Sequence, residues 1–154
     1  EGAKKHFSSM AELVRQYYAL EADVVRKTGC DIIGHFDLIT KFCDVCPQII
    51  DTCSQDYTSA RDHALSALIK TGKIFEVNTG AMARGYRRLP YPDASCLRTI
   101  AERGGKVMIT ADCHKKEQLC YGFETTKEIL VRNRFKCVYL YNNGRFESTS
   151  IENI

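Results

Sequence analysis

Segments with helical and strand-like apolar patterns alternate along this chain, and this alternation restricts the possible folds more than any other feature. Short apolar runs typical of buried strands stand at 30–34, 73–78, 106–111 and 137–141. A helical pattern precedes each run, at 10–27, at 57–70, from Asp93 to the Gly104-Gly105 pair, and at 125–133. Alternation at this spacing predicts an α/β fold with right-handed βα units and a parallel sheet or barrel.

Caps and turns support these boundaries. Ser9 and Glu12 form a capping box at the start of the first helix, and Asp93 is expected to cap the third. Asn142-Asn143-Gly144 has the composition of a hairpin turn, so residues 145–151 should return as an antiparallel strand. Residues 79–92 contain Gly, Arg and Pro and are predicted to form a long loop.

Composition indicates one folded domain with no special affinity for polymers or lipid. The 154 residues are 44% hydrophobic, and the net charge of +3 is spread along the chain. We therefore expect no nucleic-acid and no membrane partner; no apolar run approaches the ~20 residues of a membrane span. Eight cysteines occur in a chain with ample core residues and no secretion signal, which predicts reduced thiols in a cytoplasmic protein.

Polar residues follow three of the predicted strands. His35 follows the first, Glu76 and Asn78 end the second, and Asp112 and His114 follow the third. The carboxyl ends of parallel strands share one edge, where ligands bind. A carboxylate and an imidazole two residues apart suit zinc, manganese or iron. The sequence thus predicts a metal site with ligands His35, Asp112 and His114.

The number of strands and the number of ligands both point to a missing part. Four parallel strands are about half of a βα barrel, for which about eight strands in ~250 residues are usual. Three ligands could build a mononuclear catalytic site but not a multinuclear one. The chain also begins without Met. We expect that an N-terminal half is missing from these 154 residues.

Three motifs resemble a known family. They are GCDIIGHFDLITKF at 29–42, FEVNTGAMARGYR at 75–87 and ADCHKK at 111–116. In this order they resemble the C-terminal half of PHP-type histidinol-phosphatases, and the likeness extends over nearly the whole chain. Ala111 and Cys113 depart from the Ser and Ala common in that family, but neither is expected to be a ligand.

The resemblance implies a distorted (β/α)7 PHP barrel, of which residues 1–154 would supply about four βα units and the C-terminal hairpin. It further implies up to three divalent metals, with a His-x-His motif and a bridging Glu in an N-terminal half that this chain lacks and needs. His35 would bind one metal. Asp112 and His114 would bind different metals of the cluster.

The implied activity is hydrolysis of a phosphate monoester, L-histidinol phosphate, in histidine biosynthesis. Metals lower the pKa of a bound water, and Asp112 would also orient that water. Arg84, and after it Arg87, would bind the phosphate, because a guanidinium matches its oxygens. Glu76 and Asn78 would contact substrate. The alternatives are another small phosphorylated metabolite or a nucleotide as substrate, or an inactive truncated half-barrel.

Some residues have two open interpretations. Glu76 is either a substrate or supporting residue or part of a salt bridge inside the barrel. Asp37 either orients His35 or caps a loop or helix. Arg88 is expected to be a solvated residue of a basic loop.

The remaining cysteines and histidines are expected to be unremarkable. Cys43, Cys46 and Cys53 could form a zinc knuckle, but no second pair has ligand spacing, so reduced loop cysteines are favoured. His6 and His63 are predicted to be ordinary surface residues.

Overall fold

Three short parallel strands lie at the centre of the molecule, which a computed structural model describes from residue 6 to residue 154. The strands are β1 (Ile32–Ile33), β2 (Ile74–Asn78) and β3 (Lys106–Thr110), in the order β1-β2-β3. Ile33 pairs with Phe75, and Asn78 pairs with Thr110. All three carboxyl ends therefore meet at one edge, as the sequence predicted. The mixed α/β class is confirmed.

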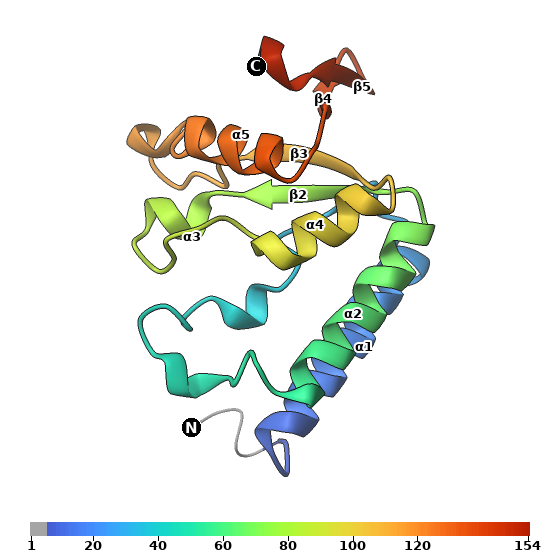
Figure 1. The fold of residues 1–154 in the computed structure, drawn as a ribbon, viewed down its shortest axis with the longest axis vertical. Coiled ribbons are helices and arrows are strands. Elements are labelled where there is room, and N and C mark those ends of the chain that lie inside the picture. Colours follow the sequence, from blue (N-terminus) through green and yellow to red (C-terminus); the bar gives the residue numbers. More distant parts are fainter. Residues whose placement is uncertain (1–5) are drawn as a thin grey trace.

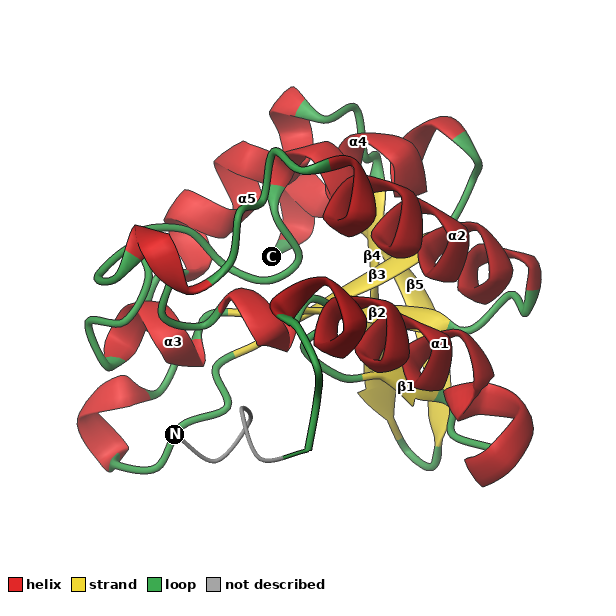
Figure 2. Ribbon diagram, turned by 90° about the horizontal axis from the view of Figure 1, so that it is seen from below, coloured by secondary structure: helices red, strands yellow, loops and turns green. Residues whose placement is uncertain are grey.

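Five α-helices are found among the described residues. They are α1 (Met10–Thr28), α2 (Gln55–Lys70), α3 (Gly80–Ala83), α4 (Ala94–Glu102) and α5 (Phe123–Arg132). Figures 1 and 2 both show α1 and α2 side by side. The side chains of Ser9 and Asp93 accept hydrogen bonds from backbone N–H groups at the starts of α1 and α4, which confirms both predicted caps. None of the described helices is both long and apolar enough to cross a membrane.

The two faces of the sheet have different surroundings. Phe75 and Val77 of β2 are fully buried in one hydrophobic core with residues of α1, α2, α4 and α5. Glu76 lies between them in the strand, so its side chain is on the opposite face. There Glu76 and Thr110 are only half-buried. Helices thus seal one face of the sheet, while the other keeps polar groups accessible.

The C-terminal hairpin is confirmed, but its first strand does not extend the parallel sheet. In it, β4 (Cys137–Asn142) pairs antiparallel with β5 (Arg145–Ser150) around Asn143 and Gly144, both at positive φ. The prediction of four parallel strands is therefore wrong: the described parallel sheet has three. The tight turn lets β4 find its hydrogen-bond partner locally, and β4 only lies beside β3, where Lys106 contacts the Tyr139 ring.

The segment predicted as a loop at 79–92 contains the single-turn helix α3. Backbone N–H groups of Ala83 and Arg84 donate to the carbonyls of Thr79 and Gly80, which closes the turn. Glycine is typical of loops, so the sequence alone predicted a loop for this segment. Here Gly80 leaves room for neighbouring side chains, and α3 leads the chain back across the carboxyl edge of the sheet (Figure 1).

Four short 3-10 turns also occur in the described part of the chain. They lie at Leu38–Thr40, Pro47–Ile49, Lys116–Gln118 and Ile151–Asn153. The first of them follows β1 and carries a buried polar residue, Thr40.

Candidate functional site

Arg84, Asp112 and His114 form a compact polar cluster just beyond β3. Nη2 of Arg84 lies 3.1 Å from Oδ2 of Asp112, and Nη1 donates to the Asp112 carbonyl at 3.0 Å. Nδ1 of His114 lies 3.1 Å from Nη1 of Arg84 and 2.9 Å from the same carbonyl. The structure thus brings the predicted phosphate-binding arginine directly to the two predicted metal ligands of the last motif.

Gly80 allows these groups to approach. A Cβ atom at this position would lie 2.8 Å from Nη2 of Arg84 and 2.9 Å from Oδ2 of Asp112. Nearby, Oδ1 of Asn78 accepts from the Gly80 N–H at 2.8 Å, and Asn78 is almost fully buried. Nδ2 of Asn78 has no hydrogen-bond partner among the described residues. Asn78 therefore holds the start of α3 and keeps both N–H donors of its side-chain amide.

The Asp112 carboxylate is stabilised in its charged form. Partial burial raises its pKa, but the hydrogen bond and positive charge of Arg84 outweigh this effect, so the pKa lies below its ordinary value. Asp112 is also at positive φ, 43°, a region that non-glycine residues rarely adopt. Such backbone strain clusters at functional sites. The cluster offers an ionised carboxylate at an exposed strand end.

His35 lies in a second cluster at the same edge. Its backbone N–H donates to Oε2 of Glu76 at 2.5 Å, and the hydroxyl of Thr110 donates to Oε1 of Glu76 at 2.6 Å. Glu76 forms no ion pair with any described residue, so the expected alternative of a salt bridge is not found. Like Asp112, His35 has a positive φ, 27°. Thr110 was not singled out from the sequence, because a strand threonine has no distinctive pattern.

The donor atoms fit a metal site only in part. Nδ1 of His35 is buried without a hydrogen-bond partner among the described residues, so this nitrogen is available to bind a metal ion. Asp112 and His114 are exposed side by side. However, residues 6–154 contain no group of three or more His, Cys, Asp or Glu side chains arranged to hold one ion. The three predicted ligands therefore lie at one edge but in two separate clusters.

Among the described residues the Asp37 carboxylate bonds to hydroxyl groups and not to His35, contrary to one of the two expectations, and it makes no capping bond at the start of the turn Leu38–Thr40. Its carboxylate accepts hydrogen bonds from the hydroxyls of Tyr18 on α1 and Tyr57 on α2. Burial raises the pKa of Asp37 to about 6, although the two tyrosine hydroxyls act against this rise. The partners come from helices remote in sequence, so no local pattern revealed them.

Arg87 is held by this buried network. Its Nη1 donates to the Thr40 hydroxyl at 2.6 Å, and that hydroxyl donates to the Asp37 carbonyl at 2.9 Å. The Arg87 guanidinium also lies over the Tyr91 ring, 4.7 Å from its centre. Arg84 is therefore closer to the other site residues than Arg87 is. Arg88 is exposed, as expected.

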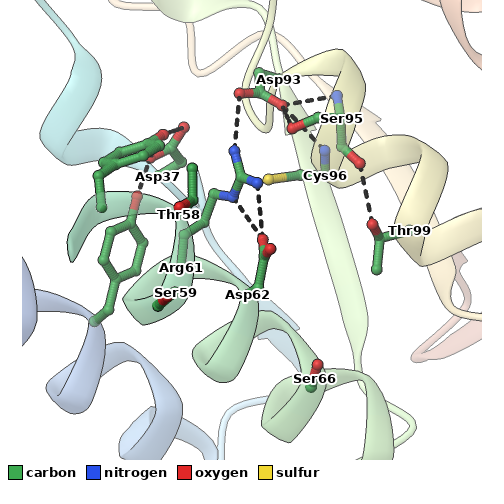
Figure 3. A network of polar contacts seen from close by, with 12 residues as sticks. Asp37, Thr58, Ser59, Arg61, Asp62, Ser66, Asp93, Ser95, Cys96 and Thr99 are labelled. Atoms are coloured by element: carbon green, nitrogen blue, oxygen red, sulfur yellow. Dashed lines mark hydrogen bonds and ion pairs between the residues drawn. The ribbon is translucent and has the colours of Figure 1, made fainter. Parts of the chain in front are cut away.

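A second polar network joins α2 to the start of α4 (Figure 3). Arg61 lies 2.8 Å from Asp62 and 3.8 Å from Asp93, beside the thiol of Cys96. Burial strongly raises the pKa of that thiol. Asp93 also caps α4 by accepting from the N–H groups of Ser95 and Cys96. This network adjoins the buried Asp37, because the Arg61 guanidinium lies 5.4 Å from the centre of the Tyr57 ring.

The other residues considered from the sequence are placed simply. All eight cysteines are free in the structure, and neither Cys43 nor Cys46 belongs to a metal-binding group among the described residues. His6 and His63 are exposed, which confirms their assignment to the surface.

Two curated proteins named probable histidinol-phosphatase are similar in sequence. The one from Schizosaccharomyces pombe is 25% identical over 119 residues, which is 77% of this chain and 39% of that protein. The one from Deinococcus radiodurans is 30% identical over 118 residues, or 76% of this chain and 42% of that protein. No family model matches the chain. The matched part spans about two fifths of each relative, and the likeness supports a histidinol-phosphatase-like hydrolase at a coarse level.

Proposed function

We propose that this chain is part of a metal-dependent phosphatase that converts L-histidinol phosphate to L-histidinol and phosphate in the cytoplasm. The observation that carries the proposal is the Arg84–Asp112–His114 cluster at the carboxyl edge of the sheet. An arginine joined to a carboxylate and an imidazole supplies both a phosphate ligand and metal ligands. The names of the two similar proteins add support for this reaction class.

His35, Asp112 and His114 would hold the metals, which we propose to be zinc, manganese or iron, up to three in the complete domain. When bound, such ions supply a water of lowered pKa and neutralise phosphate charge. The unpartnered Nδ1 of His35 and the lowered pKa of Asp112 suit this role. The remaining ligands would come from an N-terminal half of a PHP barrel, which would cover the accessible face of the sheet.

The side chains of this chain bind and orient the substrate in the proposal. Arg84 has donors left beyond its bonds to Asp112 and His114, and its side chain is 22% exposed, so it can bind phosphate oxygens. Arg87 would serve as a second phosphate ligand only after leaving Thr40. Asp112 stays ionised at neutral pH and orients the attacking water. The two N–H groups of the Asn78 side-chain amide, which have no hydrogen-bond partner among the described residues, would donate to substrate.

The direct test uses the complete protein, including any sequence encoded upstream, loaded with zinc or manganese. Released phosphate is measured from L-histidinol phosphate and from a panel of phosphorylated metabolites and nucleotides. We expect hydrolysis of L-histidinol phosphate that a chelator abolishes. Asp112→Ala and His35→Ala should each lower kcat/KM at least about 100-fold. His63→Ala, at an exposed position on α2, is the matched control and should be unaffected.

Other outcomes would replace the proposal. A metal-loaded complete protein that leaves L-histidinol phosphate intact but cleaves another phosphate ester would assign a different substrate to the same site. The low identity to the two relatives makes this the second candidate. If no His-x-His motif is encoded upstream and no ester is cleaved, the chain is an inactive half-barrel.

A further inference from the structure

We infer that Glu76 is the positioning residue of the site: it fixes the His35 backbone by linking the central strand β2 to the carboxyl ends of β1 and β3. The inference rests on the proposed function, because His35 is a ligand only in that proposal. It assigns Glu76 a role different from substrate contact. Glu76 acts through His35 and not on the reacting atoms.

The two carboxylate oxygens of Glu76 have different partners on different sides. Oε2 accepts from the His35 N–H just after β1, and Oε1 accepts from the Thr110 hydroxyl at the end of β3. Glu76 itself lies in β2, the central strand. One side chain therefore connects the middle of β2 to the carboxyl ends of β1 and β3. Because each oxygen is engaged by a short, charge-assisted bond, the carboxylate has one defined orientation.

The conformation of His35 makes such support necessary. Its φ of 27° is unfavourable for a residue with a Cβ atom and persists only where the surroundings hold it. The imidazole does not provide that support through Nδ1, which has no hydrogen-bond partner among the described residues. The bond from the His35 N–H to Glu76 is therefore the specific contact that fixes this residue and, with it, the direction of the ring.

The absence of a cation near Glu76 strengthens this assignment. No Lys, Arg or His side chain forms an ion pair with Glu76 among residues 6–154. Burial of a carboxylate without a counter-ion is costly unless its oxygens accept hydrogen bonds. Among the described residues, the His35 amide and the Thr110 hydroxyl are the donors that meet this need. The same two bonds that satisfy the carboxylate thus hold the ligand residue.

The first measurement follows the His35 amide in the complete protein. Selective 15N-histidine labelling isolates this amide, and its peak is assigned by its loss in His35→Gln. We expect Glu76→Gln to accelerate its hydrogen exchange at least about tenfold, since a charge-assisted bond is lost. Thr110→Val should give a smaller acceleration, and Thr110→Ser, which retains the hydroxyl, should restore the wild-type rate. Glu102→Gln, an exposed position on α4, is the charge-matched control.

The second measurement connects this contact with the site. Zinc affinity, determined by competition with a chromophoric chelator, should fall about 10- to 100-fold in Glu76→Gln. The kcat for L-histidinol phosphate should fall while KM changes little. In a His35→Ala background, Glu76→Gln should cause no further loss of zinc affinity, because the two residues act as one unit.

Opposite results would overturn the inference. Wild-type exchange of the His35 amide in both Glu76→Gln and Thr110→Val would show that Glu76 does not fix this residue. An undiminished effect of Glu76→Gln on zinc affinity in the His35→Ala background would show that Glu76 acts by another route. These failures differ from failure of the proposed function, in which the wild-type protein itself releases no phosphate.

Discussion

Asp37 and Asp112 are two aspartates with similar backbones and opposite surroundings. Each follows a strand of the parallel sheet and has a positive φ, 74° for Asp37 and 43° for Asp112. Asp37 is 1% exposed, whereas the Asp112 side chain is 36% exposed. The pKa of Asp37 is raised to about 6, and the pKa of Asp112 is lowered. The same residue type therefore has two different uses at one edge of the fold.

The pKa values of the two aspartates differ because different groups contact their carboxylates. The direct hydrogen-bond donors to the Asp37 carboxylate are neutral hydroxyls, and the cost of removing its charge from water is larger than the gain from these bonds. Asp112 is beside the Arg84 guanidinium, which more than compensates for partial burial. Asp37 thus organises the interior, and Asp112 is an ionised group available to a ligand.

The largest expected contrast is in stability. Asp37→Ala leaves the buried hydroxyls of Tyr18 and Tyr57 without an acceptor, so the free energy of unfolding should fall by about 2–4 kcal/mol. Asp112→Ala removes only an exposed ion pair and should change the free energy of unfolding by less than about 1 kcal/mol. Urea unfolding followed by circular dichroism measures both. If the free energy of unfolding fell equally in the two variants, the proposed structural role of Asp37 and ligand-binding role of Asp112 would be contradicted.

The dependence of stability on pH should have opposite signs for the two groups. Because the folded pKa of Asp37 is raised, its contribution is fully present below about pH 4 and is lost as pH rises through about 6. The loss amounts to at most about 3 kcal/mol. The contribution of Asp112 is present above the ordinary carboxyl pKa and is lost as pH falls through its lowered value.

Unfolding titrations between pH 4 and pH 7 isolate the Asp37 contribution, with Asp37→Asn as the comparison because its side chain does not titrate. We expect a flatter profile in that variant than in the wild type. Identical slopes for the two proteins would mean that Asp37 does not titrate in this range.

A smaller effect is expected when Arg84 is changed. Arg84→Gln removes the positive charge beside Asp112, so the pKa of Asp112 should rise towards its ordinary value. The free energy of unfolding should change by less than about 1 kcal/mol. Carboxyl 13C NMR titration measures the pKa. Arg87→Gln is the matched control, since Arg87 bonds to Thr40 and should leave the pKa of Asp112 unaltered.

The smallest expected effect comes from Gly80→Ala. The new methyl group would lie within 3 Å of Arg84 and Asp112, and the end of the arginine side chain must move away. The pKa of Asp112 should rise as in Arg84→Gln, but less, because the arginine remains nearby. Gly34→Ala serves as control, since a Cβ atom there would meet only an ordinary 3.6 Å contact with Glu76. An unchanged Asp112 titration in Gly80→Ala would mean that the ion pair adapts freely.

Much of the fold was predictable because its signals are local. Caps at Ser9 and Asp93, the turn at Asn143-Gly144 and the apolar patterns of β2 and β3 are each written within a few residues. The pairing of β4 was not predictable in the same way. An apolar run does not specify which neighbour it pairs with, and the nearby turn favoured β5 over the parallel sheet.

In the candidate site, too, local sequence patterns do not reveal contacts between residues that are distant along the chain. Strand-end positions correctly suggested that Asp112, His114 and Arg84 would meet, while their metal and phosphate roles stay predictions. The partners of Glu76 and Asp37 depend on contacts between elements that are remote in sequence. Thr110 lies 34 residues from Glu76, and Tyr18 and Tyr57 lie 19 and 20 residues from Asp37. Such contacts become visible only when the chain is folded.

The bonds from Tyr18 and Tyr57 to Asp37 also bear on how the molecule opens. They attach α1, α2 and the turn after β1 to a single buried carboxylate, so none of the three can separate without exposing the others' polar groups. We expect these segments to behave as one cooperative unit in native-state exchange, with similar opening free energies despite their distance along the chain.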